Sequence, residues 1–393
     1  MPALIVTSDF HSAVPEGRGL LAALRQRRAD GALVVDAGDF FGGNAFHEFS
    51  QGSVEQGLLT ELYDALVPGN HDVADLMRLQ CPETFPPVVC ANVRPPQAFA
   101  GRWESGIVLQ ARGQRLGIVG YLGRQAFEAI PLRERSGFSF HEPTATLLAG
   151  ERDRLTAAGA DVVIGISHSG FVHDIADQDK GWPLPIVVSG HCHSAWYHWS
   201  SQGRHVIKAP ENGLGLVQID VAEPGSTRIT VETFPSEPPQ PDGLDPVVAA
   251  YHAWGSATLG HLPAVLPSRT DVARAATEQA RTAIGSEAFV LNLASFRTGL
   301  PLQVTRQSLA DCAPFDTDLV LLDGAHTLAA LCDQARALGE EPVTAQASHL
   351  RPSGECAVAT TRYLADRLNL PARSLTPPRT LRGVLADLLQ ELS

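Results

Sequence analysis

Five short motifs carry side chains of the kinds that bind metal ions, and each follows an apolar run. They are Ser8-Asp9-Phe10-His11, Ala37-Gly38-Asp39, Pro68-Gly69-Asn70-His71-Asp72, Ser167-His168-Ser169 and Ser189-Gly190-His191-Cys192-His193. One histidine after a strand is most often a structural residue, so a single motif predicts little. Together the motifs supply Asp, His, Asp, Asn and three more His in one chain order, which is hard to attribute to chance. Carboxylate, amide and imidazole ligands in one set suit Mn, Fe or Zn better than Ca or Mg.

The segments that must position these motifs have the composition of short β-strands. The β-branched and apolar runs cover residues 4–6, 33–35, 66–67, 116–119, 162–164 and 186–188. Segments with helical spacing separate several of them, at residues 17–28, 54–65 and 144–158. Sites in α/β folds are built at strand ends, and all five motifs stand there.

After residue 204 the pattern contains strands only. Residues 205–209, 214–221 and 228–234 are expected to form a β-meander, and Asn212-Gly213 is a hairpin turn signal. The predicted fold class is therefore α/β, with an N-terminal β-sandwich flanked by helices.

A proline-rich segment divides the chain. Residues 235–246 hold five prolines in twelve residues and are expected to form a stiff extended spacer. We therefore predict a catalytic domain at residues 1–234 and a second domain at residues 247–393. In the second domain, helical spacing at 271–284 and 328–338 around a strand-like segment at 318–323 predicts a smaller α/β or α+β fold.

The composition favours a globular protein with small-molecule partners. The net charge is −13 and the 30 Lys and Arg residues are dispersed, so we expect no nucleic acid partner. No stretch approaches the roughly 18 apolar residues of a membrane span. The N-terminus lacks the features of a signal peptide, which predicts a cytoplasmic protein without a membrane partner. The six cysteines show no pairing pattern and are interpreted as buried thiols.

The order of the motifs resembles that of the calcineurin-like metallophosphatase family, whose pattern runs D-x-H, GD, GNH, a lone H and GHxH. This resemblance implies two divalent metal ions. One ion would be held by Asp9, His11, Asp39 and His193. The other would be held by the bridging Asp39 with Asn70, His168 and His191.

The resemblance also implies a mechanism. Metal coordination lowers the pKa of bound water from about 15.7 towards roughly 7, so a metal-bound hydroxide would attack the phosphorus at neutral pH. His71 would act as general acid or hydrogen-bond donor at the leaving group. The family places an Asp three residues after this histidine to orient it. Here that position is Ala74, so either Asp72 or Asp75 is expected to take the role.

Within the family, the motifs are most similar to the bacterial 5′-nucleotidase group. In the second domain, the turn at 295–299 makes Arg297 a candidate ligand for phosphate or carboxylate. The turn at 313–317 makes Phe315 a candidate ring for stacking on a flat ligand. Two features of the group are absent, because Thr317 replaces an Asn and the stretch with a second stacking ring is missing.

These residues predict a two-metal phosphomonoesterase for a small phosphorylated metabolite, such as a nucleoside monophosphate or a related biosynthetic intermediate. Two alternatives remain open. The same site could hydrolyse a cyclic phosphodiester or a sulfur ester, or the chain could be a non-catalytic metal-binding protein. The oligomeric state and the identity of the metals are not predicted.

Overall fold

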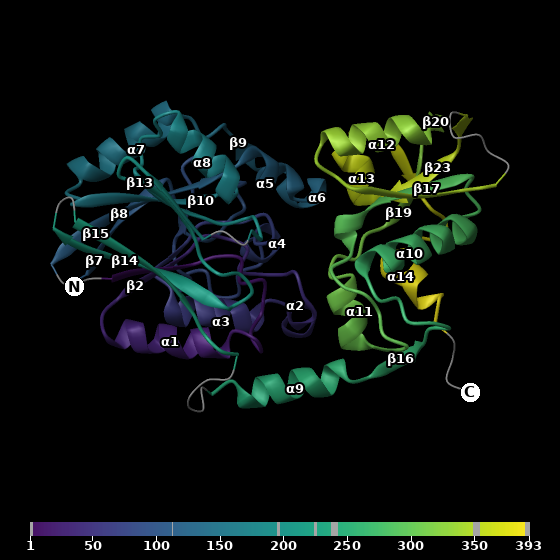
Figure 1. The fold of residues 1–393 in the computed structure, drawn as a ribbon, viewed down its shortest axis with the longest axis horizontal. Coiled ribbons are helices and arrows are strands. Elements are labelled where there is room, and N and C mark those ends of the chain that lie inside the picture. Colours follow the sequence, from purple (N-terminus) through teal and green to yellow (C-terminus); the bar gives the residue numbers. More distant parts are fainter. Residues whose placement is uncertain are drawn as a thin grey trace. The chain divides into compact units, whose positions relative to one another are not determined.

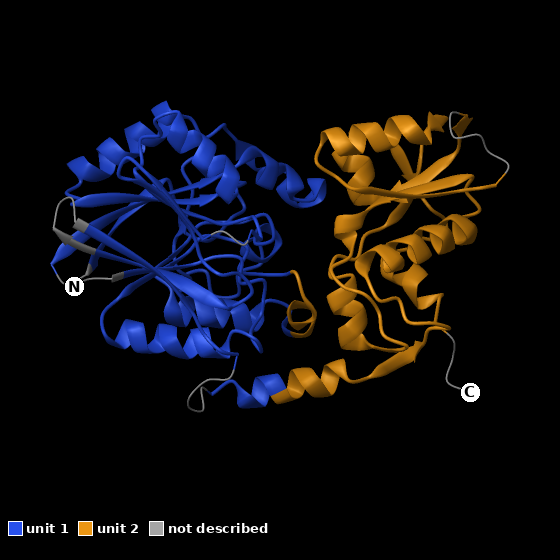
Figure 2. Ribbon diagram, in the orientation of Figure 1, with its two compact units in different colours: residues 1–42, 50–248 blue, residues 43–49, 249–393 orange. Residues whose placement is uncertain are grey.

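The computed structural model describes residues 3–111, 113–194, 197–223, 226–236, 243–348 and 354–389. The chain divides into two compact units, residues 1–42 with 50–248 and residues 43–49 with 249–393 (Figure 2). Both units combine helices with β-sheets, which confirms the predicted fold class.

Two β-sheets form the frame of the first unit (Figure 1). One has the strand order β15-β14-β1-β2-β3-β4-β6, with bounds β1 Ala3–Thr7, β2 Leu33–Asp36, β3 Ala65–Leu66, β4 Val88–Val89, β6 Trp103–Glu104, β14 Gly215–Glu223 and β15 Ser226–Thr233. The other has the order β12-β13-β11-β10-β8-β7, with bounds β7 Gly106–Ala111, β8 Gln114–Leu122, β10 Val162–His168, β11 Ile186–Ser189, β12 His198–Ser201 and β13 Arg204–Lys208. A short antiparallel pair joins β5 (Val93–Arg94) to β9 (Ser139–Phe140).

The central strands of each sheet run parallel. In the first sheet β1, β2, β3 and β4 are parallel neighbours, and in the second β8, β10, β11 and β13 are. The carboxyl ends of parallel neighbours lie at one edge of their sheet. The loops that leave these ends are therefore brought together.

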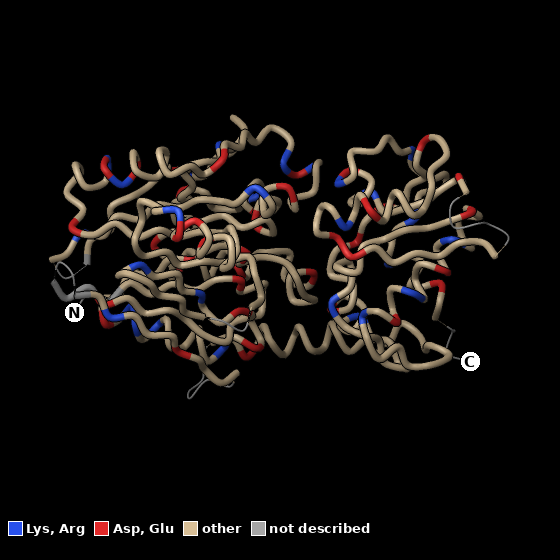
Figure 3. The backbone as a smooth tube through the Cα atoms, turned by 45° about the horizontal axis from the view of Figure 1, so that its top comes forward, with Lys and Arg blue, Asp and Glu red and all other residues tan. Residues whose placement is uncertain are grey.

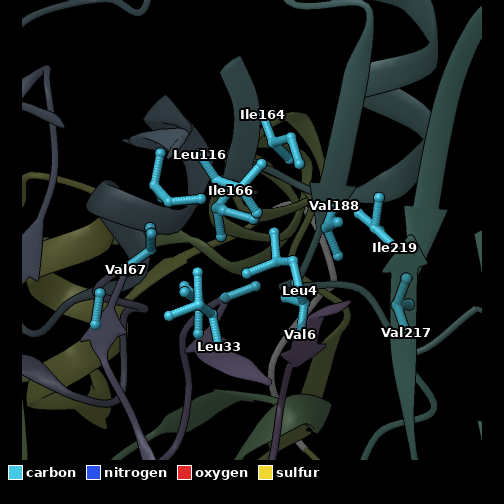
Figure 4. Packing of buried hydrophobic residues seen from close by; sticks show 14 of the residues in the cluster. Leu4, Val6, Leu33, Val67, Leu116, Ile164, Ile166, Val188, Val217 and Ile219 are labelled. Atoms are coloured by element: carbon cyan, nitrogen blue, oxygen red, sulfur yellow. The ribbon is translucent and has the colours of Figure 1, made fainter. Parts of the chain in front are cut away.

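The inward faces of the two sheets make one apolar core. Figure 4 shows Leu4, Val6 and Val217 from the first sheet gathered with Ile164, Ile166 and Val188 from the second. Valine and isoleucine dominate because β-branched side chains suit a pleated, buried surface. A closely packed core of this kind gives the strand ends fixed positions.

Helices cover the outer faces. α1 (Arg18–Ala29) packs against β2 and α3 (Ser53–Leu62), while α7 (Ala145–Ala157) packs against β7, β8 and β10. α8 (Phe171–Asp179) packs against β11 and β13. The short helices of this part of the chain are α4 (Val73–Leu76), α5 (Arg124–Ala129) and α6 (Leu132–Arg135).

The meander predicted after residue 204 is wrong. β14 and β15 pair antiparallel, but β13 belongs to the other sheet, where it lies between β11 and β12. The turn at Asn212-Gly213 has positive φ at both residues, 55° and 72°, yet it connects strands of different sheets and is not a hairpin. Local composition predicts a strand but carries no information about its distant partners.

A five-stranded sheet with helices on both faces forms most of the second unit. Its order is β21-β17-β23-β19-β24, with bounds β17 Ala288–Asn292, β19 Leu319–Leu322, β21 Pro342–Gln346, β23 Val358–Thr361 and β24 Ala372–Ser374. One face packs on α10 (Arg269–Ile284) and α14 (Leu381–Ala386), and the other on α12 (Leu328–Ala337) and α13 (Arg362–Arg367). Its remaining elements are β16 (Thr258–His261) with β18 (Gln303–Thr305), β20 (His326–Thr327) with β22 (Glu355–Cys356), α11 (Arg306–Cys312) and a 3₁₀ turn at Leu293–Ser295.

The segment Gly43–Phe49 packs with the second unit although its neighbours in sequence belong to the first. It contains most of α2 (Ala45–Ser50), and the Phe46 and Phe49 rings lie 5.2 and 5.8 Å from Tyr251 of α9 (Asp245–Gly255). Glu48 forms an ion pair with Arg382. Of the predicted spacer, residues 237–242 lie outside the described part of the chain, and residues 245 and 246 are the first two of α9.

Residues of both charges are mixed along the chain. Lys and Arg are interspersed with Asp and Glu along both units (Figure 3). In the described ranges no helix is both long and apolar enough to cross a membrane. The interpretation of the cysteines as buried is wrong for Cys81, which is exposed, and Cys192 is half-buried.

Candidate metal centre

The predicted ligands come from loops at the carboxyl ends of five strands. Asp9 and His11 follow β1, Asp39 follows β2, and Asn70 with His71 follows β3. From the second sheet, His168 ends β10, and His191 and His193 follow β11. The structure brings these residues together although they are spread over more than 180 positions.

The ligand atoms form three overlapping groups, and the atoms within each group lie within 4.8 Å of one another. They are Asp9 with His11 and His193, His11 with Asp39 and His71, and Asp39 with His168 and His191. Asn70 joins the cluster because its Oδ1 lies 2.9 Å from His191 Nδ1. All seven predicted ligands and His71 therefore share one site.

Asp39 occupies the middle of this cluster. Its Oδ2 lies 3.2 Å from His168 Nε2 and 4.0 Å from His11 Nε2. Its Oδ1 accepts the backbone N–H of His71 at 2.8 Å. Because Asp39 faces histidines of both predicted ligand sets, its carboxylate has the position that a bridging ligand needs.

Several of these ligands have a backbone conformation that side chains rarely adopt. The φ angles of Asp9, His11, Asp39 and His191 are 52°, 50°, 57° and 80°, in the left-handed region. Such conformations cost free energy and cluster at functional sites. These conformations bend the loops, and the ligand atoms of the loops lie close together.

Hydrogen bonds between the loops hold this arrangement. The N–H of Asp9 donates to the carbonyl of Gly38 at 2.9 Å, and the N–H of His191 donates to Asp9 Oδ1 at 2.8 Å. His168 Nδ1 lies 2.8 Å from the carbonyl of Ala37, which only accepts, so Nδ1 carries a proton and Nε2 faces the site. Gly69 must be glycine here, because a Cβ atom would lie 2.2 Å from Asp39 Oδ1.

The electrostatics are those of a buried cluster of opposite charges. Burial alone would raise the pKa of Asp39, but His168 and His71 hold it well below its usual value. Burial alone would lower the pKa of His168, but Asp39 raises it to about 10. Burial, and next the charge on His168, lowers the pKa of His191 to about 3. An ionised Asp39 and a neutral His191 are the forms in which these groups bind cations.

One buried oxygen indicates that the residues fit a metal ion. Asp9 is fully buried, burial raises its pKa to about 7, and its Oδ2 has no hydrogen-bond partner within the described residues. A buried carboxylate oxygen without a donor is costly, and a cation among Asp9, His11 and His193 would satisfy it. The donor set of carboxylate, imidazole and amide oxygen suits a borderline transition metal.

The two candidates for orienting His71 differ in their contacts. Asp72 is buried, and its carboxylate accepts the backbone N–H groups of Asp39, Phe41 and Gly69 at 2.9, 3.0 and 2.7 Å. These bonds make Asp72 a brace between the loops after β2 and β3, a role that the sequence did not predict. Asp75 lies on α4 and is also buried.

The two predicted recognition residues lie together in the second unit. The guanidinium carbon of Arg297 is 5.5 Å from the centre of the Phe315 ring, a cation–π distance. The N–H of Arg297 donates to the carbonyl of Cys312 at 2.8 Å, which joins the two turns. Arg382 holds the second turn, because its Nε donates to the carbonyl of Ala313 at 2.6 Å.

Comparisons with known proteins agree with this geometry. Residues 3–195 match the calcineurin-like phosphoesterase family. Over 265 residues the chain is 27% identical to snake venom 5′-nucleotidase from Gloydius brevicauda, covering 63% of this chain and 40% of that protein. Over 198 residues it is 28% identical to the same kind of enzyme from Naja atra, covering 47% of this chain and 36% of that protein. The chain thus spans about two fifths of the length of these relatives.

Solved structures match over nearly the whole chain. The 5′-nucleotidase precursor of Thermus thermophilus has a TM-score of 0.78 and 16% identity, covering 99% of this chain and 96% of that one. The sulfate thiohydrolase SoxB of Thermus thermophilus has a TM-score of 0.76 and 17% identity, covering 98% of this chain and 93% of that one.

The family match agrees with the fold. Residues 3–195 resemble the calcineurin-like phosphoesterases in sequence. With its second unit, the chain has the two-domain fold seen in 5′-nucleotidases, and it resembles these proteins in sequence. The resemblance stated from the motifs is confirmed.

Proposed function

We propose that this protein is a metal-dependent phosphoric ester hydrolase, and that it acts as a phosphomonoesterase on a small phosphorylated metabolite. The observation that carries the proposal is the position of Asp39, whose Oδ2 faces His168 at 3.2 Å and His11 at 4.0 Å. These histidines belong to separate ligand groups that share one carboxylate. This is the arrangement required for two ions about 3.5 to 4 Å apart.

Two divalent ions, Mn, Fe or Zn, would be held by the residues already described. Asp9, His11, Asp39 and His193 would hold one, and Asp39, Asn70, His168 and His191 the other. Bound there, the ions would supply Lewis-acid stabilisation of phosphoryl oxygens and a hydroxide nucleophile at neutral pH.

The remaining chemistry belongs to side chains of the chain itself. His71 is held through its backbone N–H by Asp39, and its side chain is 19% exposed. It can therefore reach a bound ester and give a proton to the leaving oxygen. Asp72 is engaged with three backbone donors, which favours Asp75 as the residue that orients His71.

Recognition of the rest of the substrate is assigned to the second unit. Arg297 and Phe315 form a cation–π pair that offers a cation and a flat ring. Such a pair suits a substrate with an anionic group and a planar ring, of which a nucleoside monophosphate is one example.

The test is a panel of esters with protein that has been stripped of metal and then supplied with Mn²⁺ or Zn²⁺. The panel holds nucleoside 5′-monophosphates, sugar phosphates, p-nitrophenyl phosphate, a cyclic phosphodiester and a sulfur ester. Released phosphate or sulfate is measured, and the monoester product of the cyclic phosphodiester, which releases no phosphate, is measured by chromatography. We expect metal-dependent turnover with the highest kcat/KM on a phosphomonoester. A preference for the cyclic or the sulfur ester would replace the proposed substrate class. Two bound ions without turnover on any ester would favour a non-catalytic metal-binding protein.

A further inference from the structure

Lys208 is a lysine in a place where lysines are rare. It ends β13, and its side chain is 0% exposed. Burying an ammonium group is costly unless it is paired and hydrogen-bonded. The chain contains only one other lysine, Lys180, whose side chain is 73% exposed.

The partners of Lys208 come from two different loops. Its Nζ forms an ion pair with Glu211, which lies three residues further along the chain. Nζ also donates to the carbonyl of Ser194 at 3.4 Å and lies 5.4 Å from the centre of the Tyr197 ring. Ser194 and Tyr197 belong to the loop after β11, whereas Glu211 belongs to the loop after β13.

Both loops are attached to predicted metal ligands. Ser194 directly follows His193, and Ser189, opposite Lys208 in the sheet, directly precedes Gly190-His191. On the other side, the N–H of Asn212, next to Glu211, donates to the carbonyl of Asp9 at 2.8 Å. The Lys208–Glu211 pair therefore stands between the loop of His191 and His193 and the loop of Asp9.

We propose that the ion pair of the buried Lys208 with the half-buried Glu211 positions the ligand group Asp9, His11 and His193, and that Lys208 is a positioning residue and not a ligand. The inference rests on the proposed metal site. A buried ion pair is often no more stabilising than well-packed apolar residues. The stability of the fold therefore does not explain why Lys208 and Glu211 are present, whereas the hydrogen bonds that they direct to the loops do. Groups that hydrogen-bond to metal ligands from outside fix the orientation of those ligands, and removing them commonly weakens metal affinity about 10- to 100-fold. We expect an effect of this size here.

The test removes the pair without changing net charge. The double variant Lys208→Met, Glu211→Gln loses one positive and one negative charge, so changed metal affinity cannot be attributed to net charge. The matched control is Lys180→Met, Asp177→Asn, which removes an exposed ion pair of the same three-residue spacing, 3.2 Å in length. Binding of Mn²⁺ to metal-free protein is measured by isothermal titration calorimetry, and the Tm is measured in chelator.

We expect two Mn²⁺ sites in the control with unchanged Kd values. In the double variant one site should weaken about 10- to 100-fold, while the other changes little and the Tm in chelator stays close to that of the parent. Unchanged Kd values at both sites, or a fall in Tm without selective loss of one site, would overturn the positioning role.

A second variant covers the case in which the double variant does not fold. Glu211→Asp keeps both charges of the pair but shortens the side chain that reaches Nζ, and it should weaken the same site in the same direction by a smaller factor. No change in either Kd with this folded variant would overturn the inference. Failure of the parent protein to bind Mn²⁺ would instead contradict the proposed metal site.

Discussion

Asp39 is the residue on which most of the site depends. It is buried, its φ of 57° is in the left-handed region, and its two oxygens face the imidazoles and the backbone of the neighbouring loops. The histidines keep its pKa well below the usual value despite burial. A carboxylate held ionised at the centre of a histidine cluster has the position and charge that the proposed bridge between two cations requires.

The substitution Asp39→Asn keeps the size of this side chain but removes one negative charge and one charged oxygen. We expect at most one tightly bound ion per chain and nearly complete loss of phosphate release. Inductively coupled plasma mass spectrometry gives the metal content, and a phosphate assay gives the turnover. Two ions per chain with near-normal turnover would show that the ligand assignment is wrong.

The substitution His71→Asn tests the proton donor. We expect kcat to fall by roughly 10²- to 10⁴-fold, the range for a positioned acid, with unchanged metal content. Leaving groups of low pKa need less help from an acid, so p-nitrophenyl phosphate should lose less activity than an alkyl phosphate. An equal loss on both esters would argue against His71 as the donor.

At the scale of elements, α8 is joined to its sheet by a buried carboxyl group. Asp174 Oδ1 accepts hydrogen bonds from the Tyr121 hydroxyl at 3.1 Å and the Ser167 hydroxyl at 2.9 Å. Burial raises the pKa of Asp174 to about 7, whereas its ordinary value is 3.8. The folded protein therefore binds a proton here that the unfolded chain releases near pH 4.

This difference predicts a pH dependence of stability. A raised folded-state pKa stabilises the fold below the unfolded value, and this contribution is lost as the pH rises from about 4 to about 7. The Asp174→Asn variant has no carboxyl group to titrate here and should not show this loss. Between pH 4 and pH 8, the free energy of unfolding of the parent should therefore fall by roughly 2 to 4 kcal/mol more than that of the variant. Urea unfolding in chelator at both pH values measures it. A constant difference between parent and variant would mean that Asp174 does not titrate in this range.

The elements could be predicted from sequence where one local signal was sufficient. The runs before Asp9 and Asp39 are β-branched and end in small residues, so the strands and the ligands after them were recognised. The strands β17 and β23 were not predicted, although the apolar run in β17 resembles those before Asp9 and Asp39. Their parallel pairing and their burial between helices depend on contacts far apart in the sequence. The placement of β13 in the second sheet likewise depends on long-range pairing.

The supporting residues of the site were beyond local prediction for a related reason. Nothing in the neighbourhood of Asp72 distinguishes a carboxylate that binds three backbone donors from one that orients His71. Asn212 carried only a turn signal, yet its N–H holds the carbonyl of Asp9. These roles depend on contacts between loops that meet only in the folded chain.

At the scale of the whole molecule, the predicted ligands all lie in one unit, and Arg297 and Phe315 lie in the other. This separation predicts a division of labour between chemistry and recognition. Arg297→Ala and Phe315→Ala should each lower kcat/KM for the preferred substrate. The lost transition-state binding energy should be about 1 to 3 kcal/mol, the scale of a lost charged hydrogen bond or ring contact. Because the two side chains lie within cation–π distance of each other, the double variant should lose less than the sum of the single variants.

The control for this prediction is p-nitrophenyl phosphate, which offers the ions an activated ester without the remainder of the natural substrate. Its kcat/KM should barely change in either variant, since binding energy remote from the reacting group is absent. If both substrates fall together, the second unit shapes the metal site or the fold, and its role as a specificity module should be abandoned.

A metal titration of the parent protein tests whether turnover needs two bound ions. Metal-free protein receives Mn²⁺ in steps, and both the ions bound per chain and the rate of phosphate release from p-nitrophenyl phosphate are measured at each step. If both ions are required, we expect little activity up to one ion per chain, a steep rise as the second ion binds, and a plateau at two ions per chain. Full activity at one ion per chain, or no activity with two ions bound, would contradict this expectation.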